Sequence, residues 1–108
     1  MKFPSDSKYH NVKVETPEGR FDSKKEAERY YELKLMERAG LITGLARQQR
    51  YELIPKVGNQ RPTYYYADFV YMKDGKLVVE DVKGIKTEVY KLKKKLMRWR
   101  YGIEITET

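Results

Sequence analysis

Hydrophobic and polar positions along the chain follow a period of two in some stretches and a helical period in others. Alternation on both sides of a TPEG turn at residues 16–19 predicts a short hairpin over residues 12–21. After Ser23, which is a good helix cap, residues 24–38 are rich in Glu, Lys, Leu and Ala and are followed by Gly40. The chain is therefore expected to begin with a hairpin and a helix.

The middle of the chain has the pattern of extended strands. Residues 45–54 predict a strand that ends at a proline-containing polar loop. The aromatic and β-branched runs 63–72 and 76–83 flank Asp74-Gly75, a dipeptide typical of a type I′ turn. We therefore expect a long hairpin here, with a third strand before it.

The last part of the chain predicts a helix and a short strand. Thr87 can cap a helix over residues 88–100, Gly102 can end it, and residues 103–106 can form a strand. The order hairpin, helix, strand, long hairpin, helix, strand predicts an α+β (α/β-like) fold, with a mixed central sheet flanked by two main helices. The length favours one domain over residues 1–108.

The predicted long hairpin brings two acidic residues together. A two-residue loop makes Lys73 face Lys76, and the same register places Asp68 opposite Asp81. Directly opposed side chains have Cβ atoms about 4.5–5.5 Å apart, and like charges at that spacing are destabilising. Lys83 shares the face of Asp81 because side chains alternate along a strand. One face is thus expected to present two carboxylates and an ammonium group.

The surroundings of this pair decide between two interpretations. A solvated sheet face on which two acids happen to meet is one of them. In the other, Val70 with Val79, and Met72 with Leu77, continue the same face, so that part of it packs against another part of the protein, while Glu80 and Val82 point away with Ala67 and Phe69. Two acids at the edge of a packed face stay ionised only if a cation or donors neutralise them.

Composition limits the kind of cation. The chain has no Cys and one His, His10, which excludes disulfide frameworks, thiolate metal sites and His-rich zinc sites. Mg²⁺ fits the remaining oxygen ligands, because it binds through one or two carboxylates and keeps several waters. The sequence has no apolar run of 18 residues and no signal-peptide pattern, so a soluble intracellular protein without a membrane partner is expected.

A third carboxylate can come from the first helix. Glu26, Tyr30 and Leu33 follow the spacing i, i+4, i+7, which places Glu26 on the line of an apolar stripe. Glu26 also stands three residues after Ser23, the spacing of a capping box. Both roles, cap and site residue, remain open for this side chain.

The positive charge is concentrated in one segment. The chain carries a formal charge of +7, and residues 83–101 contain eight basic residues and one acidic residue. Within the second helix, one helical face is expected to be buried; it consists of Val89, Leu92, Leu96 and Trp99. A second face forms a basic row; it consists of Lys91, Lys94, Lys95 and Arg98. No acid follows Glu88 there, so the row is expected to lack partners and to bind phosphates.

Tyrosines form another cluster. Tyr64, Tyr65 and Tyr66 come directly before Asp68, and aromatic side chains beside a basic surface can stack on unpaired bases. A tyrosine in a strand more often packs its ring and leaves its hydroxyl in water. The sequence leaves both interpretations open.

These residues together resemble a known family. A helix-borne Glu26, then Asp68, then Asp81-Val82-Lys83 on the partner strand, then a helix, is similar to the PD-(D/E)XK nuclease superfamily with its restriction-endonuclease-like fold. The segments FDSKKEAERYYELK, RQQRYELIP, YADFVY and VVEDVKGIKTEVYKLKKK resemble a family of small, mostly phage-encoded proteins within it. Ala67 stands where the named motif has Pro, and the chain is near the minimum length for this fold.

The resemblance implies a site and a reaction. Asp68, Asp81 and the Val82 carbonyl would bind Mg²⁺, for which Mn²⁺ can substitute, with Glu26 acting directly or through water. Lys83 would orient or help deprotonate the attacking water. Other residues are implied to support these; they are Gln48 or Gln49 near the metal water, and Thr87, Lys91, Lys94, Lys95 and Arg98 on the nucleic acid. The implied catalytic residues are therefore Glu26, Asp68, Asp81 and Lys83.

The expected function is a metal-dependent DNA endonuclease, acting on branched or recombination DNA such as Holliday junctions. By the same resemblance it would work in the cytoplasm of a bacterial host, and a homodimer is compatible with it because many nucleases that cut both strands pair their subunits. One alternative is a catalytically silent nucleic-acid-binding module of the same fold. Another is an interaction domain whose basic helix binds an acidic partner.

Overall fold

The first described element is the predicted hairpin. The computed structural model describes residues 13–108. In it, β1 (Val14–Thr16) pairs antiparallel with β2 (Gly19–Phe21). The expected start of the hairpin at Val12 lies outside the described residues, as does His10.

The first helix has the predicted bounds. α1 (Lys24–Arg38) begins after Ser23, whose Oγ accepts a hydrogen bond from the Glu26 N–H at 3.1 Å. β3 (Thr43–Ile54) follows and begins two residues earlier than predicted. The pairing with the next strand is shifted between Thr43 and Ala46, where Gly44 has a φ of 67°. This bulge interrupts the alternation on which the predicted boundary was based.

The long hairpin has the predicted register. β4 (Thr63–Lys73) pairs antiparallel with β5 (Lys76–Asp81), with Lys73 opposite Lys76. Asp74 and Gly75 both have positive φ angles, 52° and 76°, as a type I′ turn requires. β5 ends two residues before the predicted end, since the Val82 N–H donates to a carboxylate of β4 and not to its backbone.

The chain ends with a helix and a strand that lies parallel to β5. α2 (Glu88–Tyr101) begins at Thr87, whose Oγ1 accepts from the Tyr90 N–H at 3.1 Å, and ends at Gly102 in the left-handed conformation. β6 (Thr106–Glu107) starts three residues later than the predicted start at residue 103. The Ile103 N–H instead donates to the Met97 carbonyl at the helix end, which delays the return to the sheet.

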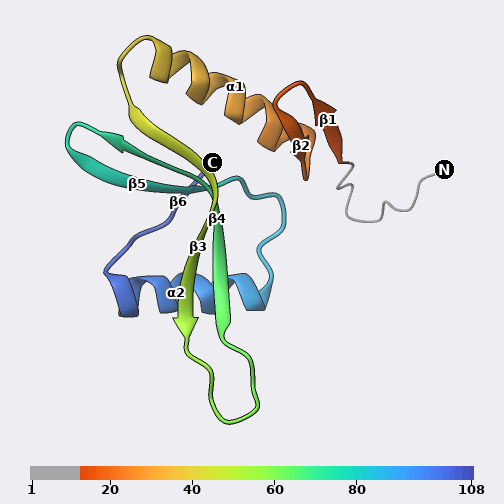
Figure 1. Ribbon diagram of the computed structural model, residues 1–108, viewed down its shortest axis with the longest axis vertical. Coiled ribbons are helices and arrows are strands. Elements are labelled where there is room, and N and C mark those ends of the chain that lie inside the picture. The colour runs from red at the N-terminus through yellow and green to blue at the C-terminus, as the bar shows by residue number, and fades with distance from the viewer. Residues whose placement is uncertain (1–12) are drawn as a thin grey trace, which may run out of the picture.

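The described elements form the predicted α+β fold. The central sheet has the order β3-β4-β5-β6 and is mixed, because β6 runs parallel to β5 while the other neighbours are antiparallel. Figure 1 shows α1 and α2 on opposite sides of the centre of the molecule, with the β3–β4 hairpin extending past α2. Within residues 13–108, neither helix is long and apolar enough to cross a membrane.

Each helix covers its own part of the core. α1 packs through Leu33 on a cluster with Ile42, Phe69 and Tyr71. The other cluster lies against α2 and has eight buried members; they are Leu53, Tyr65, Ala67, Val70, Val79, Tyr90, Met97 and Ile105. Ala67 therefore does not share the environment of Phe69, as strict alternation predicted, because it belongs to the cluster under α2. Met72 and Leu77, expected on a packed face, are exposed near the hairpin turn.

The buried face of α2 differs from the predicted one. Val89, Leu92 and Trp99 are exposed, Trp99 to 78%, while Tyr90 and Met97 are buried. The helix is thus rotated by roughly a third of a turn from the predicted orientation. Tyr90 and Met97 are seven residues apart, so their spacing fits a buried helical stripe as well as the predicted one does. Both are buried in the core under α2, whereas Trp99 is not.

A buried ion pair links α1 to β5. The Glu80 side chain is fully buried and accepts hydrogen bonds from Arg29 Nε at 2.6 Å and Nη2 at 3.0 Å. The Tyr71 hydroxyl donates to the same carboxylate at 2.6 Å. Although burial alone would raise the pKa of Glu80, these hydrogen bonds lower it. The ion pair ties α1 to β5, the strand that carries Asp81.

Candidate functional site

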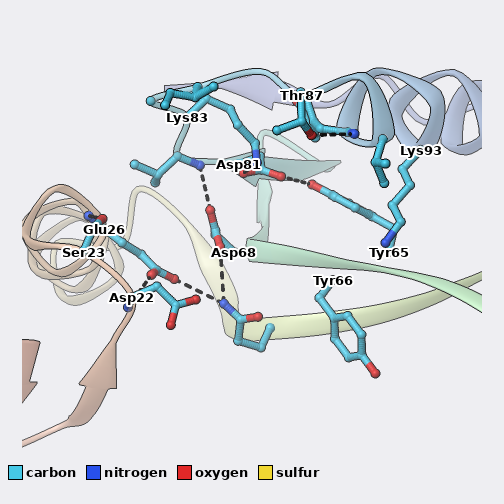
Figure 2. Close-up of a pocket in the computed structure, with 16 residues that line it drawn as sticks. Asp22, Ser23, Glu26, Tyr65, Tyr66, Asp68, Asp81, Lys83, Thr87 and Lys93 are labelled. Atoms are coloured by element: carbon cyan, nitrogen blue, oxygen red, sulfur yellow. Dashed lines mark hydrogen bonds and ion pairs between the residues drawn. The ribbon is translucent and has the colours of Figure 1, made fainter. Parts of the chain in front are cut away.

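A pocket opens where the first turns of both helices meet the sheet. Its volume is about 690 Å³. It is lined by residues from α1 and the segment before it, from β3, β4 and the end of β5, and from α2 and the segment before it (Figure 2); they are Asp22, Ser23, Glu26, Gln48, Tyr65, Tyr66, Asp68, Asp81, Val82, Lys83, Gly84, Ile85, Thr87, Val89, Tyr90 and Lys93. The predicted catalytic residues Glu26, Asp68, Asp81 and Lys83 are all in this set.

Asp68 and Asp81 lie side by side in this pocket. The five paired positions from Phe69–Glu80 to Lys73–Lys76 have the predicted register, and the two aspartates are the next positions along it. Asp68 Oδ2 accepts the Val82 N–H at 2.8 Å, which turns the chain after β5 toward β4. The predicted juxtaposition of the two carboxylates is therefore present.

Asp81 is held on both oxygens. Its Oδ2 accepts a hydrogen bond from the Tyr65 hydroxyl at 2.6 Å, and its Oδ1 lies 3.1 Å from Lys83 Nζ. The Lys83 ammonium also lies 4.1 Å from the centre of the Tyr90 ring. These contacts hold the Asp81 carboxylate and the Lys83 ammonium group together, with the ammonium over the face of the Tyr90 ring.

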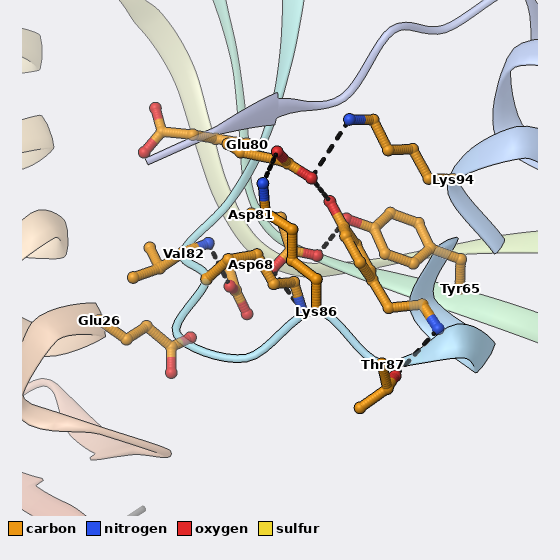
Figure 3. A network of polar contacts seen from close by, with 12 residues as sticks. Glu26, Tyr65, Asp68, Glu80, Asp81, Val82, Lys86, Thr87 and Lys94 are labelled. Carbon is orange, nitrogen blue, oxygen red and sulfur yellow. Dashed lines mark hydrogen bonds and ion pairs between the residues drawn. The ribbon is translucent and has the colours of Figure 1, made fainter. Parts of the chain in front are cut away.

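Glu26 makes a capping contact at the start of α1, one residue before the Ser23 N–H that a capping box would use, and it also lines the pocket. Its Oε1 accepts the Asp22 N–H at 3.0 Å, so it caps the start of α1. Its Oε2 accepts from Gln48 Nε2 at 3.2 Å, and the same nitrogen lies 3.3 Å from Asp68 Oδ1. Figure 3 shows Glu26 entering from α1 toward Asp68. Gln48 thereby links the third carboxylate to the aspartate pair.

Of the two glutamines considered, Gln48 belongs to the site. Gln49 Nε2 donates to the neighbouring Arg50 carbonyl at 3.4 Å and does not line the pocket. Gln48 has a φ of 52° in the middle of β3, a conformation that is unfavourable for a residue with a side chain. The strained backbone and the amide contacts occur at the same residue, as is common at functional sites.

The aspartates strongly affect each other electrostatically. Burial and the neighbouring Asp81 carboxylate raise the pKa of Asp68 to about 8, and Glu26 contributes further to the increase. The Val82 N–H acts in the opposite direction, because it hydrogen-bonds the ionised form. Ionisation of both aspartates is therefore unfavourable unless a further positive charge offsets it, and a bound cation would supply that charge.

The donor set limits which cation fits. Among residues 13–108, no group of three or more His, Cys, Asp or Glu side chains is arranged to hold a metal ion. A site built from the Asp68 and Asp81 carboxylates, a backbone carbonyl and waters is what Mg²⁺ commonly uses, whereas Ca²⁺ usually takes more protein oxygens. The residues present fit Mg²⁺ or Mn²⁺ through these two carboxylates.

The predicted basic row has partners, contrary to expectation. Lys91 pairs with Glu88 at 3.1 Å, and Lys94 pairs with Glu107 at 3.2 Å. Arg98 lies 3.5 Å from Glu104. Glu88 lies within the helix, whereas Glu104 and Glu107 come from the segment after it, which the pattern within the helix did not reveal. Of the predicted nucleic-acid residues, only Thr87 lines the pocket, whereas Lys91, Lys94, Lys95 and Arg98 do not.

Lys93 was not expected in the pocket, and Tyr65 and Tyr66 were expected only as strand or stacking residues. Lys93 lines the pocket because the rotation of α2 turns it toward the sheet. The Tyr65 hydroxyl is buried on Asp81, and Tyr66 lines the pocket while half exposed. A correct assignment of the buried stripe to Tyr90 and Met97 would have identified Lys93, which stands three residues after one and four before the other.

Comparison with known proteins identifies the family. A family model described as "Protein of unknown function (DUF1064)" matches residues 6–107, so the chain belongs to this family. A search of curated proteins and a search of solved structures each found no match.

Proposed function

We propose that this member of the DUF1064 family is a metal-dependent DNA endonuclease, with branched or recombination DNA among its substrates. The observation that carries the proposal is the joint position of Asp68, Asp81 and Lys83 in one pocket at the start of α2. The resemblance to the PD-(D/E)XK superfamily supports it, because the same three residues form that motif. The reaction is hydrolysis: a water oxygen bonds to phosphorus, the ester bond breaks, and the leaving oxygen takes up a proton.

The carboxylates would hold the metal. Asp68, Asp81 and the Val82 carbonyl would bind Mg²⁺, with Glu26 acting directly or through water. The bound ion would lower the pKa of a water and stabilise the charge that develops on the phosphate. The chain itself supplies the position of these groups, since the Val82 N–H and the Gln48 amide orient Asp68, and the Tyr65 hydroxyl orients Asp81.

Lys83 and α2 would bind the phosphate and the water. The Lys83 ammonium is mostly buried and is positioned by Asp81 and the Tyr90 ring, so it can donate to an attacking water or to a phosphate oxygen. Thr87 and Lys93 line the same pocket from the first turns of α2. The N-terminus of a helix favours anions, and a phosphate beside Thr87 would gain from that orientation.

A catalytically silent binding module is the second candidate. The ammonium group of Lys83 already offsets part of the negative charge of Asp81, which a metal ion would otherwise neutralise. The absence of a third metal-ligating carboxylate among the described residues also favours this candidate. In that case the pocket would bind a phosphate without hydrolysing it.

Cleavage assays distinguish the two candidates. Supercoiled plasmid, single-stranded DNA and a four-way junction are incubated with Mg²⁺, with Mn²⁺ or with EDTA. We expect cleavage that requires metal and that falls at least about 100-fold in Lys83→Ala and in Asp81→Asn. Asp74→Asn is the matched control, since it removes an exposed acid at the hairpin turn, away from the pocket.

Two results would contradict the nuclease. If the wild-type protein binds these DNAs without metal-dependent cleavage, the silent module is correct. If cleavage persists in Lys83→Ala and Asp81→Asn, it comes from a contaminant or another site.

A further inference from the structure

We propose that Tyr66, with Tyr64 and Arg50, forms a stacking site for an unpaired nucleobase beside the carboxylate pocket. This inference rests on the proposed function, because it takes the ligand of the pocket to be a nucleic acid. It adds the substrate class: a nucleic acid with at least one unpaired base next to the phosphate that is cleaved.

The three side chains share one surface of the β3–β4 hairpin. Arg50 is paired with Tyr66 across the two strands, and opposed residues of a sheet share a face. The Arg50 guanidinium lies 4.6 Å from the centre of the Tyr64 ring, and the Tyr64 and Tyr66 rings are 6.4 Å apart. The result is a patch of two rings and a cation.

Tyr66 differs from the other tyrosines that neighbour the site. The hydroxyls of Tyr65 and Tyr90 each donate to a carboxylate, and both rings are buried. Tyr66 is 50% exposed, and within residues 13–108 neither its hydroxyl nor that of Tyr64 makes a side-chain hydrogen bond. Packing and hydrogen bonding thus explain why tyrosines stand at positions 65 and 90, but they do not explain the tyrosine at position 66.

Its position connects the patch to the pocket. Tyr66 precedes Asp68 by two residues, about 6.6 Å along a strand, and it lines the same pocket. Figure 2 shows its ring extending away from Asp68 and Asp81. A base on this ring would therefore belong to a nucleotide close to a phosphate bound at the carboxylates.

The charges around the patch suit a nucleic acid. Arg50 makes no ion pair with an acid in the described part of the chain, so its charge remains available to a phosphate or a base. The acid next in the row, Glu52, lies 3.6 Å from Arg100 Nη2, which offsets its negative charge. Aromatic rings beside such cations bind unpaired bases of any sequence, whereas bases in a duplex are already stacked and paired.

Binding without metal tests the stacking site separately from catalysis. Fluorescence anisotropy in EDTA measures the dissociation constants of a labelled oligothymidylate, an abasic oligonucleotide of equal length and a blunt duplex. We expect Tyr66→Ala to weaken oligothymidylate binding about tenfold, equivalent to about 1.4 kcal/mol, and duplex binding less than twofold. Tyr66→Phe keeps the ring and should bind as the wild type does.

Two controls keep the result specific. Tyr31→Ala removes another exposed tyrosine, on α1 and outside the pocket, and should change no dissociation constant. The abasic strand should bind the wild type and Tyr66→Ala equally, because it has no base to stack. If it still distinguishes them, the substitution acts through the fold or the backbone contacts.

The stacking site is wrong if Tyr66→Ala binds oligothymidylate as tightly as the wild type, or if duplex binding falls equally. Neither result depends on cleavage. Loss of binding in Tyr66→Ala together with no cleavage by the wild-type protein in Mg²⁺ would refute the nuclease and leave the stacking site intact. Metal-dependent cleavage by the wild-type protein together with unaltered binding by Tyr66→Ala would support the nuclease and refute the stacking site.

Discussion

At the scale of single residues, Asp68 occupies a position where an ionised carboxylate is unfavourable. It is surrounded by Asp81 and Glu26, and its own oxygens accept from a backbone N–H and an amide. A buried carboxylate among other carboxylates destabilises the fold, so the position of Asp68 is better explained by binding than by stability. The same reasoning predicts how the protein responds to metal.

Asp68→Asn should remove the response to Mg²⁺ without weakening the fold. In EDTA above about pH 8, where Asp68 is ionised, the variant is expected to unfold at the same temperature as the wild type or higher, because one of two opposed carboxylates becomes neutral. Mg²⁺ at about 100 times its dissociation constant should stabilise the wild type by about 2.7 kcal/mol and leave Asp68→Asn unchanged. Thermal unfolding with and without Mg²⁺ measures both effects.

Asp74→Asn again serves as the control, and it should respond to Mg²⁺ as the wild type does. An equal increase of the unfolding temperature in Asp68→Asn would show that the ion binds elsewhere.

At the scale of elements, α2 shows how a helix can be predicted correctly and still be oriented incorrectly. Its bounds, its Thr87 cap and its Gly102 end follow from local sequence. Two apolar stripes exist on it, and only contacts with the sheet select the one that contains Met97. The selection also determines which lysine faces the pocket.

Substitutions at the end of α2 test this orientation. Met97→Ala should lower the free energy of unfolding by about 2–5 kcal/mol, because it leaves a cavity in the core. Trp99→Ala, two residues later, should change it by about 0.5 kcal/mol or less, because the indole is largely exposed. Urea unfolding measures both values. If the two effects were reversed, the predicted stripe of Val89, Leu92, Leu96 and Trp99 would be the buried one.

A second element-level contact joins β6 to α2. Glu107 accepts hydrogen bonds from the Tyr90 hydroxyl at 2.7 Å, and it pairs with Lys86 at 2.9 Å and Lys94 at 3.2 Å. The Tyr90 hydroxyl and then Lys86 lower the pKa of Glu107 from 4.5 to about 2. A carboxyl group whose pKa is lowered by folding stabilises the fold at pH values above its ordinary pKa. This stabilisation is lost as the pH falls through the lowered pKa of the folded state.

Glu107→Gln should therefore be less stable than the wild type at pH 7. The difference should shrink as the pH falls below about 4.5 and disappear near about pH 2. Urea unfolding at several pH values measures it. A difference that stays constant down to acid pH would mean that the charge of Glu107 contributes nothing.

At the scale of the whole molecule, the net charge of +7 is distributed differently from the sequence expectation. Acids of the C-terminal segment neutralise part of the basic row on α2. The basic residues that line the pocket are Lys83 and Lys93. We therefore expect the nucleic acid to contact the pocket side of α2 more than the row of Lys91, Lys94, Lys95 and Arg98.

Two lysines of the same helix distinguish these surfaces. Lys93→Ala should weaken DNA binding and reduce the slope of log K against log salt by about 1, since one phosphate contact is lost. Lys95→Ala removes the same charge from a side chain about 160° around the helix axis, and should leave the slope unchanged. Binding titrations between low and moderate salt measure both slopes. The opposite result would restore the predicted basic row as the binding surface.

Local sequence was sufficient for most of the elements and for the aspartate pair. Capping residues and turn dipeptides act within a few residues, so the bounds of α1 and the register of the β4–β5 hairpin were predictable. That register alone brought Asp68 next to Asp81. Boundaries that depend on other strands, such as the start of β3 and the position of β6, were predicted less well.

Tertiary structure decided everything that depends on which surfaces meet. It turned α2 so that Tyr90 and Met97 are buried and Lys93 faces the pocket, placed the Tyr65 hydroxyl on Asp81, and linked Glu26 to Asp68 through Gln48. The physical reason is that a helical period and a charge run define faces but not their partners. The partners are set by packing and by the pairing of buried polar groups, which join residues far apart in the chain.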